Sequence, residues 1–190
     1  INDPMNLYNA APYADGAAAL ILTRRDLLPK ELPYPVVRVG GSSAAIDTLA
    51  LHDRKDPLAF EAVKRAAHAA GMQAGILPVH ANLIELDDSF SIYAALTMEA
   101  CGLAEKGKAA AMARDGLLAP TGKLPVLTMG GCKGRGNPLG AKGVYQAVEA
   151  TLQLRGLAGS NQVPDARVAL TIALGGPAST AIAHLLVREA

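Results

Sequence analysis

A glycine-rich segment, GGCKGRGNPLGAKG (residues 130–143), combines the residue types that most directly suggest chemistry. It leads into an apolar-periodic stretch that is typical of a helix. A glycine loop before a helix can bring backbone N–H groups and the positive helix end toward a cleft. A carbonyl oxygen, a thioester or a phosphate could be bound there. The segment also contains Lys133, Arg135 and Lys142, which we interpret as solvated surface cations.

Two nucleotide-binding motifs are excluded for this segment. A Walker A loop needs GxxxxGK[ST], and no Gly-Lys-Ser/Thr is present. A Rossmann GxGxxG follows the first strand of a domain, whereas Gly134, Gly136 and Gly140 have the wrong spacing and lie late in the chain. Asn137 has a purely structural interpretation, because Asn is a preferred N-cap and Pro138 a preferred first helical residue. On local evidence alone, capping is favoured.

Composition restricts the class of protein. The chain has 190 residues, 51% of them hydrophobic, which is enough for one domain or a little more with a real core. The 18 Lys and Arg residues balance 17 Asp and Glu residues, so we expect no nucleic-acid partner. No apolar run approaches the roughly 20 residues that span a membrane. Cys101 and Cys132 form no CxxC pair and the histidines are scattered, so we expect no metal site and a cytoplasmic location.

Apolar runs typical of strands alternate with amphipathic stretches typical of helices, which predicts an α/β architecture. Strands are expected at residues 16–23, 34–43 (closed by a glycine pair), 82–86, 167–174 and 181–187. Helices are expected from Asp56-Pro57 to Gly71, from about Phe90 to Gly102, and from Asn137-Pro138 onward with Val144, Ala147, Val148, Thr151 and Leu152 facing inward.

Four segments, in this order, resemble motifs of the C-terminal half of thiolases, especially the sterol-carrier-protein-x type and the archaeal acetoacetyl-CoA thiolases. APYADGAAALIL (11–22) is similar to a strand motif S-D-G-A-A-A, and IELDDSF (84–90) to E-L-H-D-A-F. GGCKGRGNPLGAKG (130–143) is similar to G-G-x-x-x-x-G-H-P-x-G-A-T-G, and LTIALGGPAST (170–180) to L-T-H-N-x-G-G-x-G. The resemblance implies a thiolase-like fold, with a mixed five-stranded sheet and helices forming part of an αβαβα layered assembly.

Thiolases transfer or remove an acyl group at coenzyme A through a Cys nucleophile carried on their N-terminal half. The C-terminal half normally adds the His of G-H-P, an oxyanion-hole Asn or His, and a late acid–base Cys or His. Carried onto this sequence, those positions are Asn137, Asp87 and Ile172. An amide has no accessible pKa near neutrality, and Ile172 has no proton to exchange. A carboxylate at Asp87 would repel a developing oxyanion unless it were protonated or paired.

The backbone framework of the site persists although its acid–base groups are changed. By resemblance, the residues expected to line an acyl-CoA site are Phe90, Gly136, Pro138, Gly140, Gly175 and Gly176. Cys132 could substitute as a reactive group, since nearby cations lower thiol pKa values, but a buried inert cysteine is favoured. Steroid side-chain aldolases are thiolase-like enzymes that work with tyrosines, so Tyr93 and Tyr145 are candidates for such a role by resemblance. Core packing is the favoured interpretation of Tyr93. His52, His68, His80 and His184 match no catalytic position of the family.

The resemblance also implies a domain organisation and partners. Residues 1–33 would end the N-terminal thiolase half, and residues 34–190 would form the C-terminal domain. We expect another chain to supply the N-terminal half, a homo- or hetero-oligomer, and a zinc-ribbon/OB-fold protein as a further partner. No tightly bound cofactor is expected, only coenzyme A or acyl-CoA as substrate or ligand. The chain would be an acyl-CoA-associated subunit without ordinary thiolase acid–base residues; the alternatives are an active acetyl-CoA acetyltransferase-like enzyme, a retro-aldolase on CoA thioesters, or a plain interaction domain.

Overall fold

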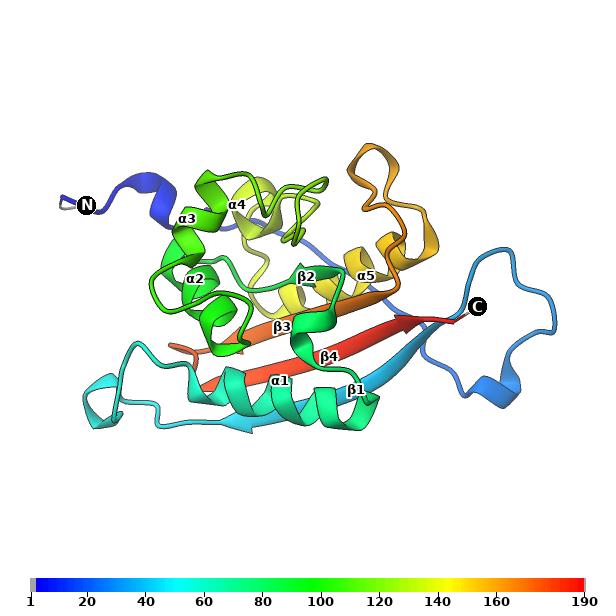
Figure 1. Ribbon diagram of the computed structural model, residues 1–190, viewed down its shortest axis with the longest axis horizontal. Coiled ribbons are helices and arrows are strands. Elements are labelled where there is room, and N and C mark those ends of the chain that lie inside the picture. Colours follow the sequence, from blue (N-terminus) through cyan, green and yellow to red (C-terminus); the bar gives the residue numbers. More distant parts are fainter. Residues whose placement is uncertain (1–2, 190) are drawn as a thin grey trace.

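The computed structural model describes residues 3–189, which form a mixed α/β fold around a single sheet (Figure 1). The four strands in this range are β1 (Val37–Ile46), β2 (Leu83–Glu85), β3 (Val168–Gly175) and β4 (Thr180–Arg188), in the order β1-β4-β3-β2. β4 is antiparallel to β1 and β3, whereas β2 is parallel to β3. The expected α/β class and mixed sheet are confirmed, with four strands rather than five in the described residues.

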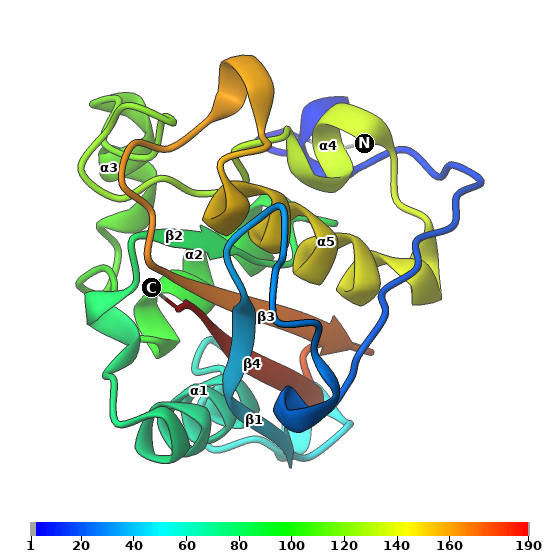
Figure 2. The same ribbon diagram turned by 90° about the vertical axis from the view of Figure 1, so that its right-hand side faces the viewer.

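Helices cover both faces of this sheet. The α-helices are α1 (Glu61–Ala74), α2 (Ser91–Ala100), α3 (Ala109–Arg114), α4 (Gly131–Arg135) and α5 (Lys142–Arg155). Short 3₁₀ turns lie at Leu7–Asn9, Arg25–Leu27, Leu51–Asp53, Pro78–His80, Leu139–Ala141 and Gly159–Asn161. α1 lies against β1 and β4 on one face, and α5 lies across β3 and β2 on the other (Figure 2). The sheet is therefore the middle layer of three.

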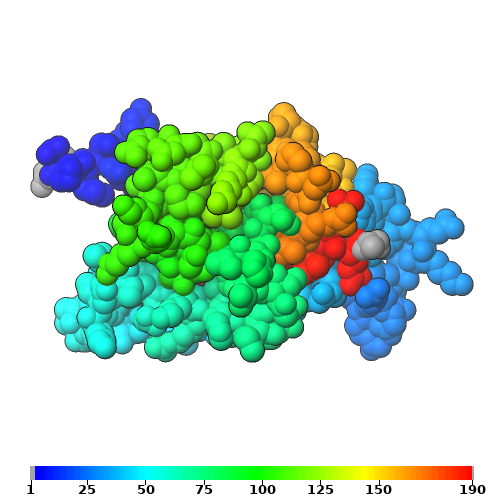
Figure 3. All heavy atoms as spheres, viewed as in Figure 1, coloured from blue at the N-terminus to red at the C-terminus, as the bar shows by residue number. Residues whose placement is uncertain are grey.

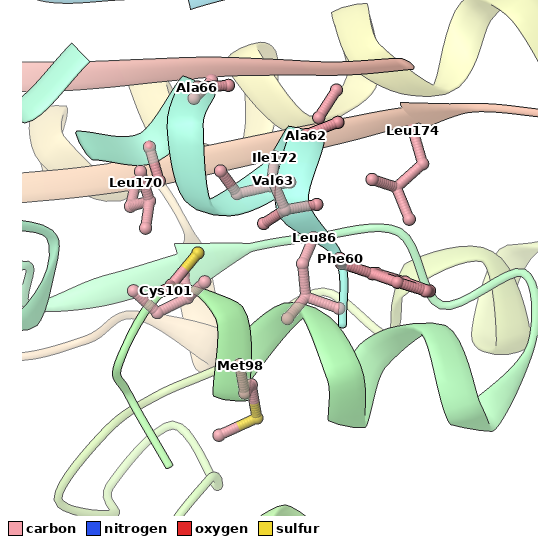
Figure 4. Close-up of a cluster of buried hydrophobic side chains, with 14 of the residues drawn as sticks. Phe60, Ala62, Val63, Ala66, Leu86, Met98, Cys101, Leu170, Ile172 and Leu174 are labelled. Atoms are coloured by element: carbon pink, nitrogen blue, oxygen red, sulfur yellow. The ribbon is translucent and has the colours of Figure 1, made fainter. Parts of the chain in front are cut away.

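The main hydrophobic core lies between the sheet, α1 and α2. Ile172 of β3 and Ala183 of β4 are paired in register and fully buried, so both point to this face. Val63 of α1 and Met98 of α2 close the core from outside (Figure 4). The strand period of two then places Thr171 and Ala173 on the opposite face, toward α5.

The sequence pattern predicts that the glycine pair Gly40–Gly41 ends the strand, and this prediction was wrong. β1 continues to Ile46, with an irregular register between Val39 and Gly41. A Cβ at Gly41 would overlap the backbone carbonyl of Ala70 in α1. The glycine therefore allows α1 to lie directly on the strand.

Residues 16–23, predicted as a strand, have no strand partner within the described chain. The side chain of Ile21 is 97% exposed. An apolar run forms a strand only where a neighbouring edge offers hydrogen bonds, and β1 to β4 leave this segment outside their sheet. The chain before β1 instead runs along the molecule (Figure 1), and near residue 30 it forms a loop that projects from the end opposite its first residues (Figure 3).

Two predicted helix starts were wrong. The Asp56 carboxylate accepts the Leu58 N–H at 2.9 Å and closes a turn, so α1 begins only at Glu61. It continues through Gly71 and ends at Gly75, whose φ of 67° is left-handed. α5 begins at Lys142, because the 3₁₀ turn Leu139–Ala141 lies between it and Pro138.

The predicted inward face of α5 was also wrong. The helix buries Gln146, Glu149, Ala150, Gln153 and Leu154, and leaves the predicted apolar positions only half-buried or exposed. The buried polar side chains have partners: Gln146 donates to the Ile172 carbonyl at 3.1 Å, and Gln153 donates to Thr128 Oγ1 at 2.7 Å. Hydrogen bonding thus allows α5 to bury polar side chains together with Ala150 and Leu154, while its other apolar side chains lie toward the outside.

Candidate functional site

Asn137 is held in place by the segment that precedes the sheet. Its N–H donates to the Pro12 carbonyl at 2.7 Å, and its own carbonyl accepts from the Ala14 N–H at 3.2 Å. Gly136 precedes it with φ of 94°, and a Cβ there would overlap the Ala14 side chain. Only glycine fits at this position, because the conformation and the close approach both exclude a side chain.

The side chain of Asn137 is also fixed. Its Oδ1 accepts the Leu139 N–H at 3.0 Å, and its Nδ2 donates to Ser89 Oγ at 3.2 Å. The residue is 7% exposed and borders a cavity of about 370 Å³. That cavity is lined by Tyr13, Ala14, Asp15, Gly16, Asn137, Pro138 and Leu139. The amide caps a tight turn rather than a helix, and it presents a neutral polar group to the cavity.

Asp87 is fully buried and paired. Its Oδ1 accepts hydrogen bonds from the backbone N–H and the hydroxyl of Ser89, at 2.9 Å and 2.6 Å. Its Oδ2 forms an ion pair with the ammonium of Lys142, which also lies 3.4 Å from Ser89 Oγ. The interpretation of Lys142 as a solvated cation was wrong, since its side chain is only 18% exposed. The positive charge supplies the pairing that a carboxylate at this position requires.

Asp88 anchors the glycine loop. Its two carboxylate oxygens accept the backbone N–H groups of Cys132 and Lys133, at 2.7 Å and 3.0 Å, at the start of α4. Burial, then the charges of Asp88 and Asp87, raise the pKa of the Cys132 thiol to about 11. At neutral pH the thiol is therefore protonated, which removes the nucleophilic thiolate. Arg135, interpreted from the sequence as solvated, is also largely buried.

We expect Asp88→Asn to lower the free energy of unfolding by about 1–3 kcal/mol. The substitution replaces one of the two accepting oxygens by an NH₂ group, which then faces a backbone N–H, so that two donors oppose each other. Chemical denaturation would measure the loss. Asp115→Asn, an exposed change of the same type, should shift stability by less than about 0.5 kcal/mol. Equal effects of the two substitutions would contradict an anchoring role for Asp88.

The remaining predicted site residues fall in different places. Gly140 and Gly175 line a second cavity, of about 420 Å³, beside Lys142. Phe90 precedes α2 and packs edge-on against Tyr93 at 5.1 Å. Ile172 does not join the cluster, because its side chain is fully buried in the core on the opposite face of the sheet (Figure 4). Gly176 begins the β3–β4 turn with a left-handed φ of 56°.

Tyr93, Tyr145 and His184 lie near these groups, and none of the three is a hydrogen-bond partner of the Asn137 side chain. Tyr93 packs between Phe60 and Phe90, and burial, then the charge of Asp87, raises its pKa. Tyr145 lies under the Arg135 guanidinium, 4.8 Å from its ring centre. His184 borders the 420 Å³ cavity, and its Nδ1 lies 2.9 Å from Ser42 Oγ. Burial lowers the pKa of His184, which keeps the imidazole neutral near pH 7.

A buried ionic cluster behind the glycine loop was not predicted. Arg135 donates to Glu149 of α5 at 2.6 Å, and Glu85 of β2 lies next to this pair. Burial, then the charge of Glu149, raises the pKa of Glu85 well above its usual range. The Thr128 backbone lies close to the Glu85 carboxyl group, but neither Glu85 oxygen has a hydrogen bond of good geometry within the described chain. A proton on Glu85 relieves part of this deficit, because a carboxylic acid can donate to the Glu149 carboxylate.

Neither a metal centre nor a membrane span emerges from the described part of the chain. Within residues 3–189, no group of three or more His, Cys, Asp or Glu side chains is placed to hold a metal ion. None of the helices in that range is both long and apolar enough to cross a membrane.

Comparisons with known proteins agree on one family. Residues 43–188 match the family described as thiolase C-terminal domain-like. The chain is 40% identical over 188 residues to an acetyl-CoA acetyltransferase of Methanothermobacter thermautotrophicus, covering 99% of this chain and 49% of that protein. It is 35% identical to sterol carrier protein 2 of Oryctolagus cuniculus, covering all of this chain and 36% of that protein.

A solved structure shows the same fold. The Ltp2-ChsH2(DUF35) aldolase superposes with a TM-score of 0.74 at 23% identity, over 84% of this chain and 41% of that one. The chain spans half or less of the length of these relatives. The predicted resemblance is confirmed: the chain belongs to the thiolase C-terminal domain-like family.

Proposed function

We propose that this chain forms the C-terminal half of a thiolase-like acyl-CoA site and acts with an N-terminal thiolase half, without the usual imidazole. The observation that carries the proposal is the geometry of Asn137. Its amide borders a cavity, and both of its polar atoms are engaged by Ser89 and Leu139. Such a group can orient a thioester oxygen but cannot take a proton from a thiol.

The outward-facing apolar surface supports an N-terminal partner half. Ile46 of β1 is 73% exposed and Ile182 of β4 is 40% exposed, on the sheet face that α5 covers only in part. Leu20, Val144 and Ala147 line one cavity together with Ile182, so residues before β1 and the apolar flank of α5 continue this surface. Contiguous exposed apolar area is typical of an interface. We propose that residues 1–33 belong structurally to the partner half and residues 34–190 to this domain.

The wider assembly follows from the same proposal. An N-terminal half would supply the nucleophilic cysteine and would complete the αβαβα layers of the thiolase-like assembly. We expect the assembled protein to be a homo- or hetero-oligomer. The aldolase neighbour is named together with a DUF35 protein, which supports an accessory subunit of the zinc-ribbon/OB-fold type here. Both cysteines are free and buried, which suits a reducing compartment such as the cytoplasm.

An active enzyme is the alternative, either an acyltransferase or a retro-aldolase on CoA thioesters. The acetyl-CoA acetyltransferase relative and the aldolase neighbour favour it, since the same fold can host different chemistry. The Asp87–Lys142 pair also favours it, because it keeps charged groups where the family carries an oxyanion-hole residue.

The experiment combines the chain with an N-terminal thiolase half supplied in trans. Calorimetry with free CoA tests binding, and thiolysis of acetoacetyl-CoA tests turnover. We expect the complex to bind CoA and to show low turnover. Asn137→His should raise the turnover rate by about 10–100-fold, because an imidazole can act as a general base, and general base catalysis contributes roughly 10²–10⁴-fold in an optimised site. Asn161→His, at an exposed position, is the matched control.

Two outcomes would reject parts of this proposal. Absence of CoA binding by the complex would leave only the plain interaction domain. Substantial turnover by the unmodified chain that falls steeply in Asn137→Ala would establish the active-enzyme alternative.

A further inference from the structure

The ionic cluster behind the glycine loop contains two carboxyl groups and one cation. Glu85 and Glu149 are buried, and both face Arg135. If both carboxyl groups were ionised, one negative charge would be left uncompensated away from water, which is costly. A single proton shared by the two carboxyl groups makes the cluster neutral. Charge balance therefore calls for one bound proton, to which the proposed function gives no role.

Exposure to water falls in steps across this cluster. The Arg135 side chain is 20% exposed, that of Glu149 is 8% exposed, and Glu85 is fully buried. Water therefore reaches the cluster from the Arg135 side, and Glu85 is the last group to be hydrated. Arg135 is the last residue of α4, so a displacement of this short helix opens the cluster to water. Loss of the proton and displacement of α4 are thus coupled.

The helix α4 has little apolar packing of its own. It has five residues and buries only Gly131 and Cys132. Its position depends largely on polar contacts at its two ends: Asp88 accepts two N–H groups of the first turn, and Arg135 donates to Glu149 at 2.6 Å. A segment with few buried apolar contacts opens at a lower free energy than the whole fold.

The end of α4 leads directly into the candidate site. Gly136 and Asn137 follow Arg135 in the sequence, and the Asn137 side chain is hydrogen-bonded to Ser89. A shift of Arg135 must therefore move or strain the turn that presents the Asn137 amide.

The surroundings of the carboxyl pair oppose a second negative charge. Burial, then the charge of Glu149, raises the pKa of Glu85. Thr171 of β3 lies opposite Glu85 in register and does not titrate. The titratable or charged groups around the pair and its arginine come from each element packed there: Arg135 and Cys132 from α4, Tyr145 from α5, and Asp88 from the loop after β2.

We propose that Glu85 and Glu149 share one proton and form, together with Arg135, a proton-dependent latch that holds α4 and the Asn137 turn in place. Displacement of α4 hydrates Glu85, which then releases its proton to the solvent. The latch is tightest at acidic pH and weakens as the pH rises from the ordinary carboxyl pKa to the raised pKa of Glu85. It involves only the chain's own residues and operates whatever ligand the candidate site takes.

Amide hydrogen exchange of the full chain measures the latch. Exchange of the N–H groups of Cys132, Lys133, Gly136 and Asn137, all hydrogen-bonded, is recorded from pH 5 to pH 8 and corrected for the intrinsic rate of each amide. We expect protection to fall about tenfold per pH unit within the window, because opening releases one proton. Urea well below the unfolding midpoint should leave this protection unchanged, since a local opening exposes little surface.

Two variants identify the proton. Glu85→Gln has the shape of the protonated acid and cannot ionise, so the protection of α4 should become independent of pH. Glu149→Gln leaves Arg135 to pair with Glu85 alone, which then ionises nearer the ordinary carboxyl pKa, so the fall in protection should move to lower pH. Glu105→Gln, at an exposed position, is the matched control and should keep the wild-type slope.

Three results would overturn the latch. Protection of α4 that does not vary with pH in the wild-type chain would do so without any variant. A pH slope that persists in Glu85→Gln would assign the proton to another group. Protection that falls in dilute urea would show that α4 opens only together with the whole fold.

Discussion

Replacing Arg135 with Met should lower the free energy of unfolding by about 3–5 kcal/mol at pH 7. The Arg135 side chain is 20% exposed and that of Glu149 is 8% exposed, so solvent screens the pair little. Without the guanidinium, the Glu149 carboxylate keeps a buried charge beside Glu85 and must either remain unpaired or take up a proton. Urea denaturation at pH 7 measures the loss.

The pH dependence of this loss identifies its origin. Glu149 takes up a proton more readily at pH 5 than at pH 7, so the effect of Arg135→Met should shrink as the pH falls. Arg65→Met removes an exposed arginine from α1 and should change stability by less than about 0.5 kcal/mol. A loss that is equal at both pH values would indicate lost packing on Tyr145 rather than an uncompensated charge.

Replacing Glu85 with Gln should stabilise the protein above about pH 5 and change it little below about pH 4. Burial, then Glu149, raises the pKa of Glu85 in the folded protein. Between the ordinary carboxyl pKa and this raised value, the unfolded chain releases a proton that the folded chain retains. Stability therefore falls with rising pH through that window, by about 1.4 kcal/mol per pH unit for one group.

Glutamine has the shape of a protonated glutamate and cannot ionise. The free energy of unfolding of the variant should therefore lack this contribution to its pH dependence. Unfolding free energies of both proteins from pH 4 to pH 8 would show the two curves diverging as the pH rises. Glu105→Gln, at an exposed position, should leave the slope unchanged. Parallel curves for wild type and Glu85→Gln would show that Glu85 is ionised in the fold.

The sheet was the most predictable part of the molecule. The apolar runs at 82–86, 167–174 and 181–187 correspond to β2, β3 and β4, because buried strands between helical layers need apolar side chains on both faces. The run at 16–23 has the same composition and forms no strand within the described chain. Composition reports that a segment can pair, whereas pairing also depends on an available edge.

The proximity of Asn137 and Asp87 could be predicted from the sequence, whereas the partners of their side chains could not. The glycine loop, Asn137 and Asp87 do come together, as the motifs implied. The role of Lys142 was missed, because its partner lies 55 positions away and charge alone gives no sign of burial. A glutamate inside the apolar run NLIEL was an available signal for the buried cluster, since an unpaired carboxylate does not stay in a buried strand.

The α5 helix shows why amphipathic patterns can mislead. Its glutamines and Glu149 face inward, where each has at least one partner: Arg135 for Glu149, the Ile172 carbonyl for Gln146 and Thr128 for Gln153. A pattern of apolar positions reports which side avoids water, not which neighbour will cover it. On this helix, the chain's own sheet leaves the predicted apolar positions half-buried or exposed.

The attachment of Asn137 to Pro12 and Ala14 bears on how this domain could be excised or grafted. A designer who trimmed the chain to residues 34–190 would keep every residue of the glycine loop and discard the backbone to which its central amide is tied. The grafted loop would then need other hydrogen-bond partners for the backbone of Asn137, or the Asn137 side chain would lose its position beside Ser89.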